Sequence, residues 1–91
     1  MKRTFIKDLK EKLDQTVTVQ GWLQTLRDQK SMQFLIIRDH TGLVQAAHWK
    51  KGNPELAELI STIGTESSLT LTGKVVANEV VKLGGLELQL E

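Results

Sequence analysis

The stretch RDQKSMQFLIIRDHTGLVQ, residues 27 to 45, contains most of a β-hairpin. Residues 32–38 form one predicted strand and residues 43–49 the next, and only the four residues DHTG connect them. Gly42 closes this connection and supplies the permissive backbone that a tight hairpin favours. The stretch therefore predicts two neighbouring antiparallel strands.

The register of this hairpin decides which side chains face a core. If Arg38 pairs with Leu43 across the turn, four apolar residues meet on one face, as a barrel interior requires. These four are Leu35, Ile37, Val44 and Ala46. The opposite face then carries Phe34, Ile36, Arg38, Leu43, Gln45 and Ala47. On that face Phe34 lies on the diagonal from Gln45, so both can reach one flat ligand group.

Alternation of apolar and polar residues predicts three more strands. They cover residues 17–24, 69–77 and 86–91, and in the first of them Val17, Val19, Gly21 and Leu23 share one side. The sequence Leu83 to Gly85 (LGG) predicts the turn before the last strand.

Two helices are predicted as well. The segment NPELAELISTIG, residues 53–64, has Asn53 as N-cap, Pro54 at the first helical position and Gly64 as its stop. Its apolar face consists of Leu56, Leu59, Ile60 and Ile63. A shorter helix near the N-terminus, capped by Thr4, would place Ile6, Leu9 and Leu13 on one side.

Five strands with a helix between the third and the fourth follow the order of the OB-fold. We therefore predict an all-β domain with one or two helices, a five-stranded Greek-key barrel that occupies residues 1–91 as a single domain. OB-folds bind oligonucleotides across the face of strands 2 and 3.

Composition limits the possible functions. The charged fraction of 25% and the formal net charge of +1 are those of an average globular protein, so nucleic-acid binding must depend on local placement of charge. Cysteine is absent, which excludes disulfides and thiolate metal sites, and His40 and His48 have no third ligand at metal spacing. No apolar run approaches the roughly 20 residues of a membrane span, so we expect no membrane partner and a cytoplasmic location.

Three side chains near the hairpin could bind RNA. Phe34 could stack on a base for about 1 to 3 kcal/mol, and the amide of Gln45 could both donate to and accept from a base edge. Arg27, at the end of the first strand, could bind phosphate or a base edge. The alternative is structural: Phe34 covers the outside of the barrel, Gln45 is solvated, and Arg27 pairs with Asp28 or Asp39.

The sequence resembles the N-terminal anticodon-binding OB-fold domain of class II aspartyl-tRNA synthetases, and more loosely that of the asparaginyl and lysyl enzymes. Besides the hairpin, the resemblance rests on Gly21-Trp22, Arg38-Asp39, Val44-Gln45 and the ending VKLGGLEL from Val81. It covers nearly the whole chain, and the compact form is closer to the archaeal type, which leaves open that both aspartate and asparagine tRNAs are charged.

The resemblance implies a role for each matching residue. The aromatic that matches Phe34 stacks on the central uridine of the anticodon, the glutamine that matches Gln45 reads its edge, and the arginine that matches Arg27 contacts the anticodon. An acidic residue that faces the first anticodon base corresponds to Glu79, although the register of that loop is not fixed. Weaker candidates near the same surface are Gln29, Lys30 and Gln33.

The resemblance also implies which functions belong to the rest of a parent protein. The ATP site, its Mg and the adenylate chemistry would belong to the catalytic domain of a parent aspartate-tRNA ligase, a cytoplasmic homodimer, so this chain alone would be no enzyme and would hold no cofactor. Its partner would be the tRNA anticodon stem-loop, and the isolated domain would be a monomer. Alternatives are an asparaginyl- or lysyl-type synthetase domain, or a free-standing OB-fold module that binds single strands or a protein.

Overall fold

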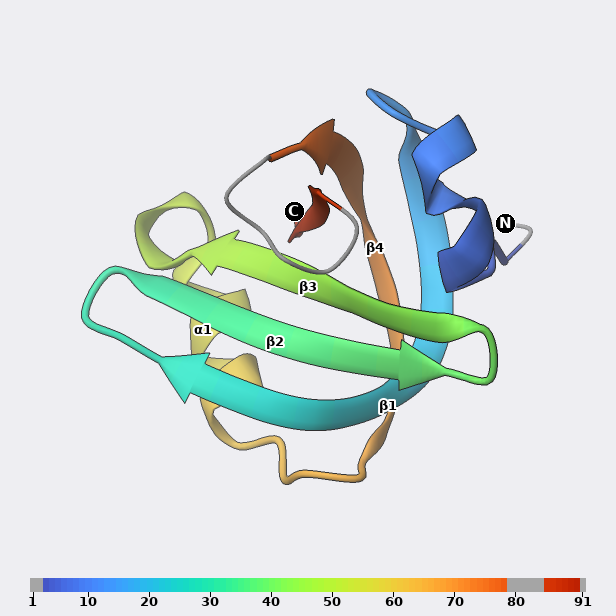
Figure 1. Cartoon of the computed structure of the whole chain (residues 1–91). Helices are drawn as coiled ribbons and strands as arrows, with labels where there is room; N and C mark the ends of the chain where they lie inside the picture. Colours follow the sequence, from blue (N-terminus) through green and yellow to red (C-terminus); the bar gives the residue numbers. More distant parts are fainter. Residues whose placement is uncertain (1–2, 79–84, 91) are drawn as a thin grey trace.

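The five strands close into a barrel with the order β1-β2-β3-β5-β4 in this computed structural model, which describes residues 3–78 and 85–90. The strands are β1 (Thr16–Asp28), β2 (Met32–Asp39), β3 (Gly42–Trp49), β4 (Ser68–Ala77) and β5 (Leu86–Leu90). The helices are η1 (Ile6–Glu11), η2 (Lys50–Gly52) and α1 (Pro54–Ser61). The predicted OB-fold, with its helix between the third and fourth strands, is confirmed (Figure 1).

The predicted hairpin register is also confirmed. Arg38 pairs with Leu43, and two further pairs, Leu35 with Ala46 and Ile37 with Val44, fill the interior. All four interior side chains have no exposed surface. Because side chains alternate along a strand, the residues between them must face outward.

A bulge in β1 sets which way the end of that strand faces. The pairing of β1 with β2 shifts between Leu23 and Thr25, so two residues of β1 oppose one of β2 at that point. Leu23 faces the interior before the bulge and Leu26 packs against the core after it. Arg27 consequently faces outward, opposite Phe34.

One polar residue at each end of β2 ties a helix to the barrel. At one end, Gln33 Nε2 donates to the carbonyl oxygen of Ala57 in α1, at 2.9 Å. At the other end, Asp39 Oδ2 accepts from the backbone N–H of Ile6 in η1, at 2.9 Å. The two helices therefore lie at opposite ends of the β2–β3 hairpin (Figure 1).

The carboxylate of Asp39, rather than the backbone of Gly42, organises the hairpin turn. Asp39 Oδ1 accepts from the N–H of Thr41 at 2.7 Å and from the N–H of Gly42 at 3.1 Å, while Gly42 itself has no positive φ. Burial alone would raise the pKa of Asp39, but these hydrogen bonds, with those from the Thr41 hydroxyl and the Ile6 N–H, hold it below its usual value. In the predicted LGG turn Gly85 has a φ of 69°, and the other two residues lie outside the described part.

The helices differ in detail from their predicted ranges. Asn53 Oδ1 caps α1 by accepting from the N–H of Leu56 at 3.2 Å, as expected, but the helix ends at Ser61 rather than at Gly64. The predicted apolar face was partly wrong, because Leu59 is exposed and Ala57 is buried in its place. The N-terminal helix is a short 3-10 helix in which Phe5, not Thr4, occupies the N-cap position, without a capping side-chain hydrogen bond. It ends at Glu11, before Leu13, which is exposed.

Candidate nucleic-acid interface

The outward face of the sheet forms two parallel rows of side chains that cross all five strands. The β-sheet register aligns them from β1 through β2, β3 and β5 to β4. One row is Arg27, Phe34, Ala47, Gln89 and Lys74; the other is Thr25, Ile36, Gln45, Glu87 and Val76. Two of the predicted site residues fall in the first row and one in the second.

Phe34 and Arg27 lie side by side in the first row. Phe34 is half-buried, Arg27 is exposed, and the guanidinium carbon of Arg27 is 6.0 Å from the centre of the Phe34 ring. That distance is the outer limit of a cation–π contact, so the arginine remains free to bind another group. The alternative that Arg27 pairs with Asp28 or Asp39 is wrong, because Asp28 pairs with Lys50 and Asp39 binds backbone N–H groups.

Gln45 has one apolar and one acidic neighbour on the adjacent strands. It pairs with Ile36 of β2 on one side and with Glu87 of β5 on the other. Glu87 is the direct neighbour of Gln45 on the next strand, and only 9% of its surface is exposed. An amide can donate and accept, whereas a carboxylate only accepts, so this pair offers a base edge two different hydrogen-bonding groups.

Sequence reasoning did not single out Glu87. The alternation in β5 already placed it on the outward side, with Leu86 and Leu88 facing the core. What the alternation could not supply is the parallel pairing of β3 with β5, which joins residues 42 positions apart, Gln45 and Glu87. Such a long-range neighbour has no local signal.

The loop between β1 and β2 is held in place by the end of β3. The N–H of Lys50 donates to the carbonyl oxygen of Ser31 at 3.0 Å, and Lys50 Nζ lies 2.6 Å from Asp28 Oδ1. The hydrogen bond from Lys50 holds the pKa of Asp28 below its usual value. Gln29 and Lys30, two of the weaker candidates, are exposed in this loop next to Arg27.

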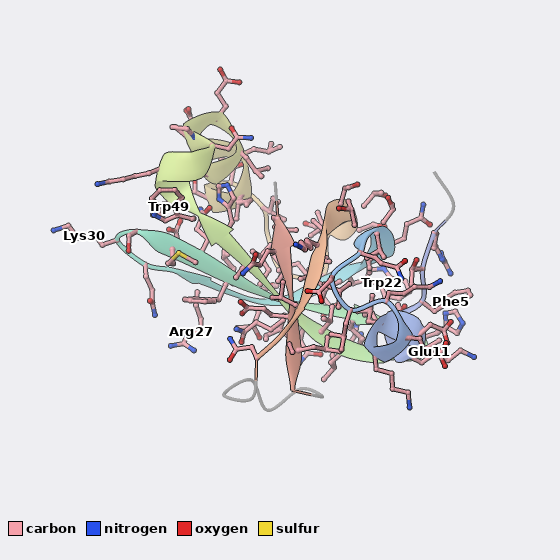
Figure 2. All side chains as sticks on the ribbon, turned by 90° about the horizontal axis from the view of Figure 1, so that it is seen from above. Phe5, Glu11, Trp22, Arg27, Lys30 and Trp49 are labelled. Atoms are coloured by element: carbon pink, nitrogen blue, oxygen red, sulfur yellow. The ribbon has the colours of Figure 1, made fainter. Side chains whose placement is uncertain are left out.

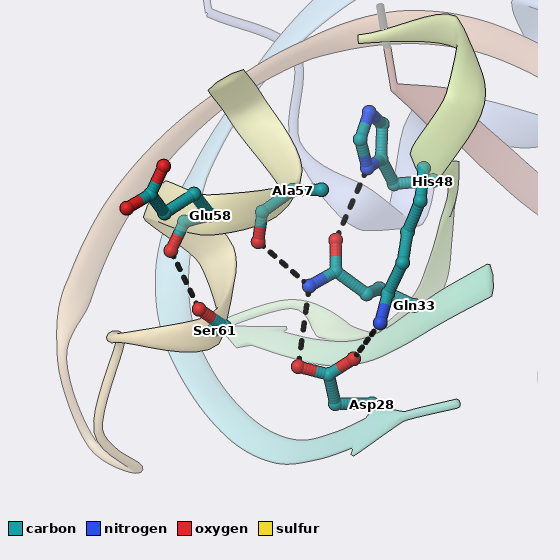
Figure 3. A network of polar contacts seen from close by, with 7 residues as sticks. Asp28, Gln33, His48, Ala57, Glu58 and Ser61 are labelled. Atoms are coloured by element: carbon teal, nitrogen blue, oxygen red, sulfur yellow. Dashed lines mark hydrogen bonds and ion pairs between the residues drawn. The ribbon is translucent and has the colours of Figure 1, made fainter. Parts of the chain in front are cut away.

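Gln33 does not lie on this surface, which corrects the prediction. Its side chain has no exposed area because position 33 belongs to the inward side of β2. The amide nitrogen donates to the carbonyl of Ala57 at 2.9 Å and approaches Asp28 Oδ2 at 3.4 Å, and the amide oxygen lies 3.1 Å from His48 Nδ1 (Figure 3). Gln33 therefore supports the barrel end and the β1–β2 loop from inside.

This network fixes the tautomer of His48. Because the amide nitrogen of Gln33 faces two acceptors, its oxygen faces His48, and Nδ1 of His48 must carry the proton. The other ring nitrogen, Nε2, is then an acceptor, and it is buried with no hydrogen-bond partner among the described residues. Burial lowers the pKa of His48, so the ring is neutral.

The two tryptophans lie on the outer surface of the barrel. Trp22 on β1 and Trp49 on β3 both face outward, with 42% and 57% of their surface exposed. Glu79 lies outside the described residues. Within the described part of the chain, no three acidic, histidine or cysteine side chains cluster as a metal site would require, and no helix is long and apolar enough to cross a membrane.

Comparisons with known proteins agree with this geometry. The family model for tRNA anti-codon domains, described as an OB-fold nucleic acid binding domain, matches residues 17–91. An asparagine–tRNA ligase of Desulforamulus reducens is 43% identical over 88 residues, 97% of this chain and 20% of that protein. An aspartate–tRNA(Asp) ligase of Thermoplasma volcanium is 38% identical over 92 residues, 100% of this chain and 21% of that protein.

A solved structure extends the likeness to three dimensions. The asparaginyl-tRNA synthetase of Pyrococcus horikoshii, complexed with asparaginyl-adenylate, superposes with a TM-score of 0.90 at 32% identity, and the match covers 100% of this chain and 21% of that one. The chain thus spans about a fifth of the length of these relatives. With a family model that matches most of its length, the chain belongs to the tRNA anticodon-binding family of OB-fold nucleic-acid-binding domains.

Proposed function

We propose that this domain binds the anticodon stem-loop of a tRNA and reads the central base with Phe34 and Gln45. The observation that carries the proposal is their placement on one outward face, in adjacent rows of the barrel, with Arg27 exposed beside Phe34. A half-buried ring beside an exposed guanidinium gives this face a stacking surface and a positive charge at one place.

Each side chain then has a separate task. Phe34 stacks on the base and supplies affinity that depends little on base identity. Gln45 supplies selectivity, since its amide can match the O4 acceptor and the N3–H donor of uridine but not the order of groups on cytidine in the same pose. Arg27 contributes charge toward a phosphate or a base edge.

The parent protein is proposed to be a class II ligase that charges a tRNA with aspartate or asparagine. The asparagine alternative has somewhat more support than the aspartate assignment inferred from the sequence, because the relatives named for asparagine and aspartate are 43% and 38% identical to this chain, respectively. ATP, its Mg and dimerisation belong to the remainder of that parent in this proposal, and its location is cytoplasmic.

Titration of labelled anticodon stem-loops that differ only at the central base tests the proposal. The domain should bind the uridine-centred loop most tightly, and binding should weaken as salt concentration rises because phosphate contacts contribute. Equal affinity for all four central bases would remove the reading function, and absence of binding would remove RNA recognition altogether.

Replacement of Gln45 sharpens this test. Gln45→Ala should weaken binding of the uridine loop by roughly 1 to 3 kcal/mol, because hydrogen bonds to the base are lost, and should leave the cytidine loop almost unchanged. Gln45→Glu keeps the shape but cannot donate, so it should also lose selectivity. Gln24→Ala, an exposed glutamine of β1 outside both rows, is the matched control. Parallel losses on both loops would mean that Gln45 holds RNA without reading it.

A further inference from the structure

Trp49 continues the outward face beyond Phe34. It lies two residues after Ala47 on β3 and pairs with Met32, in the register in which Ala47 pairs with Phe34. More than half of its surface, 57%, is exposed. Figure 2 shows Trp49 toward the same end of the molecule as Arg27 and Lys30, with Trp22 toward the other end. An exposed indole thus extends the proposed RNA-binding surface.

The Trp49 ring rests on the chain that follows it. A Cβ atom added to Gly52 would lie 3.3 Å from Cε3 and 3.9 Å from Cζ3 of the indole, so the absence of a side chain at position 52 leaves room for the ring. Support from one side reduces the freedom of the ring. A supported aromatic loses less entropy when a flat ligand stacks on it than a freely rotating one does.

A hollow opens beside Trp49 on the same face. It has a volume of about 210 Å³ and is lined by Met32, Ala47, Trp49, Glu87, Gln89 and Leu90. Ala47 and Glu87 are nearly buried, whereas Gln89 is exposed, so the Gln89 amide is the polar group of this lining that a ligand can reach most readily. A nucleobase has the matching chemistry, with apolar faces and a polar edge.

The spacing suits two neighbouring nucleotides. Phe34 and Trp49 are diagonal neighbours across β2 and β3, and such neighbours lie about 7 to 8 Å apart, with their Cβ atoms somewhat closer. Stacked bases lie about 3.4 Å apart, so two bases on these rings would be splayed from each other, as single-stranded loops permit.

We propose that Trp49 is a second stacking platform and receives the nucleobase adjoining the one on Phe34, with the polar edge of that base toward Gln89 or Glu87. This inference rests on the proposed function. Trp22 shows the contrast, because it lies toward the other end of the molecule, outside both rows (Figure 2). The arginine beside its ring, Arg38, is held in an ion pair with Glu66 at 3.0 Å, whereas the arginine beside Phe34, Arg27, is not in either ion pair of the described residues.

Tryptophan fluorescence can separate the two rings, because the chain has two tryptophans and no tyrosine. In Trp22→Phe the signal comes from Trp49, and in Trp49→Phe it comes from Trp22. We expect saturation with the uridine-centred stem-loop to quench the first variant strongly and the second one little. Anisotropy of a label on the RNA reports binding independently of either ring.

Abasic substitutions identify the nucleotide. Removal of the base on one side of the central uridine should abolish the quenching of Trp49 and weaken binding about 5- to 150-fold, and Trp49→Ala should weaken binding by a similar factor at unchanged melting temperature. Quenching that survives both abasic neighbours, or RNA that binds without changing Trp49 fluorescence, would overturn the inference and leave the proposed function standing. If no stem-loop changes the anisotropy, the proposed function itself fails. Tight binding by Trp49→Ala would show that this ring covers the barrel or meets a protein.

Discussion

The inward and outward sides of the β2–β3 hairpin have the same backbone and different tasks. Leu35 has no exposed surface and packs in the core, while Phe34, its immediate neighbour, is half-buried on the surface beside Arg27. Side chains alternate along a strand, so a shift of one residue would exchange the two sets. Register therefore separates the residues that stabilise the barrel from those proposed to bind RNA.

The largest expected effect is on the inward side. Leu35→Ala should cost about 2 to 5 kcal/mol in the free energy of unfolding, since truncation of a buried leucine loses contacts and leaves a cavity. Leu43→Ala, on the outward side of β3, is the matched control and should cost much less. Urea or thermal unfolding measures both. A Leu43 variant less stable than the Leu35 variant would break the comparison.

The outward side should show the opposite behaviour. Phe34→Ala should weaken binding of the uridine-centred stem-loop by about 1 to 3 kcal/mol, the usual contribution of one stacked base, while the barrel stays folded. Stem-loop titration gives the binding change, and a melt of the same variant gives the stability. If Phe34→Ala destabilises the barrel more than Leu35→Ala does, the ring is a structural cover instead of a stacking surface.

Local sequence signals were enough for the elements and for the hairpin register. The four-residue turn and the apolar residues of both strands specify the pairing of Leu35 with Ala46. In that register Leu35, Ile37, Val44 and Ala46 all face the interior, whereas a shift by one residue would turn apolar side chains outward. The helix start was equally clear, since Asn53 followed by Pro54 combines a capping side chain with a favourable first position.

Features that depend on distant segments could not be predicted from the sequence. The bulge near Thr25 turns Arg27 outward, and no residue type there announces it. Gln33 was named as a weak candidate near the RNA-binding surface, although strand alternation puts it on the same side of β2 as Leu35 and Ile37. It is buried because Ala57 of α1 and His48 of β3 satisfy its amide, and neither is a neighbour in sequence. Polar residues on an inward side are thus the hardest to place.

The smallest expected effect concerns the inward polar pair of Gln33 and His48 and is seen in the pH dependence of the free energy of unfolding. Burial lowers the pKa of His48 in the folded protein, whereas the unfolded chain should bind its proton near the ordinary value of about 6.5. Below that pH, down to the folded pKa, the unfolded state binds more protons, so stability should fall as pH falls and rise as pH approaches neutrality.

His48→Gln keeps a donor for Gln33 Oε1 and cannot titrate, so it should flatten this part of the pH profile of stability. His40→Gln, at the exposed turn, should retain it. Urea unfolding at several pH values between 5 and 8 compares the wild type with the two variants. If the free energy of unfolding of His48→Gln depends on pH as steeply as that of the wild type, His48 is protonated as readily in the folded as in the unfolded protein. The inward side of β3 would then be open to water near His48.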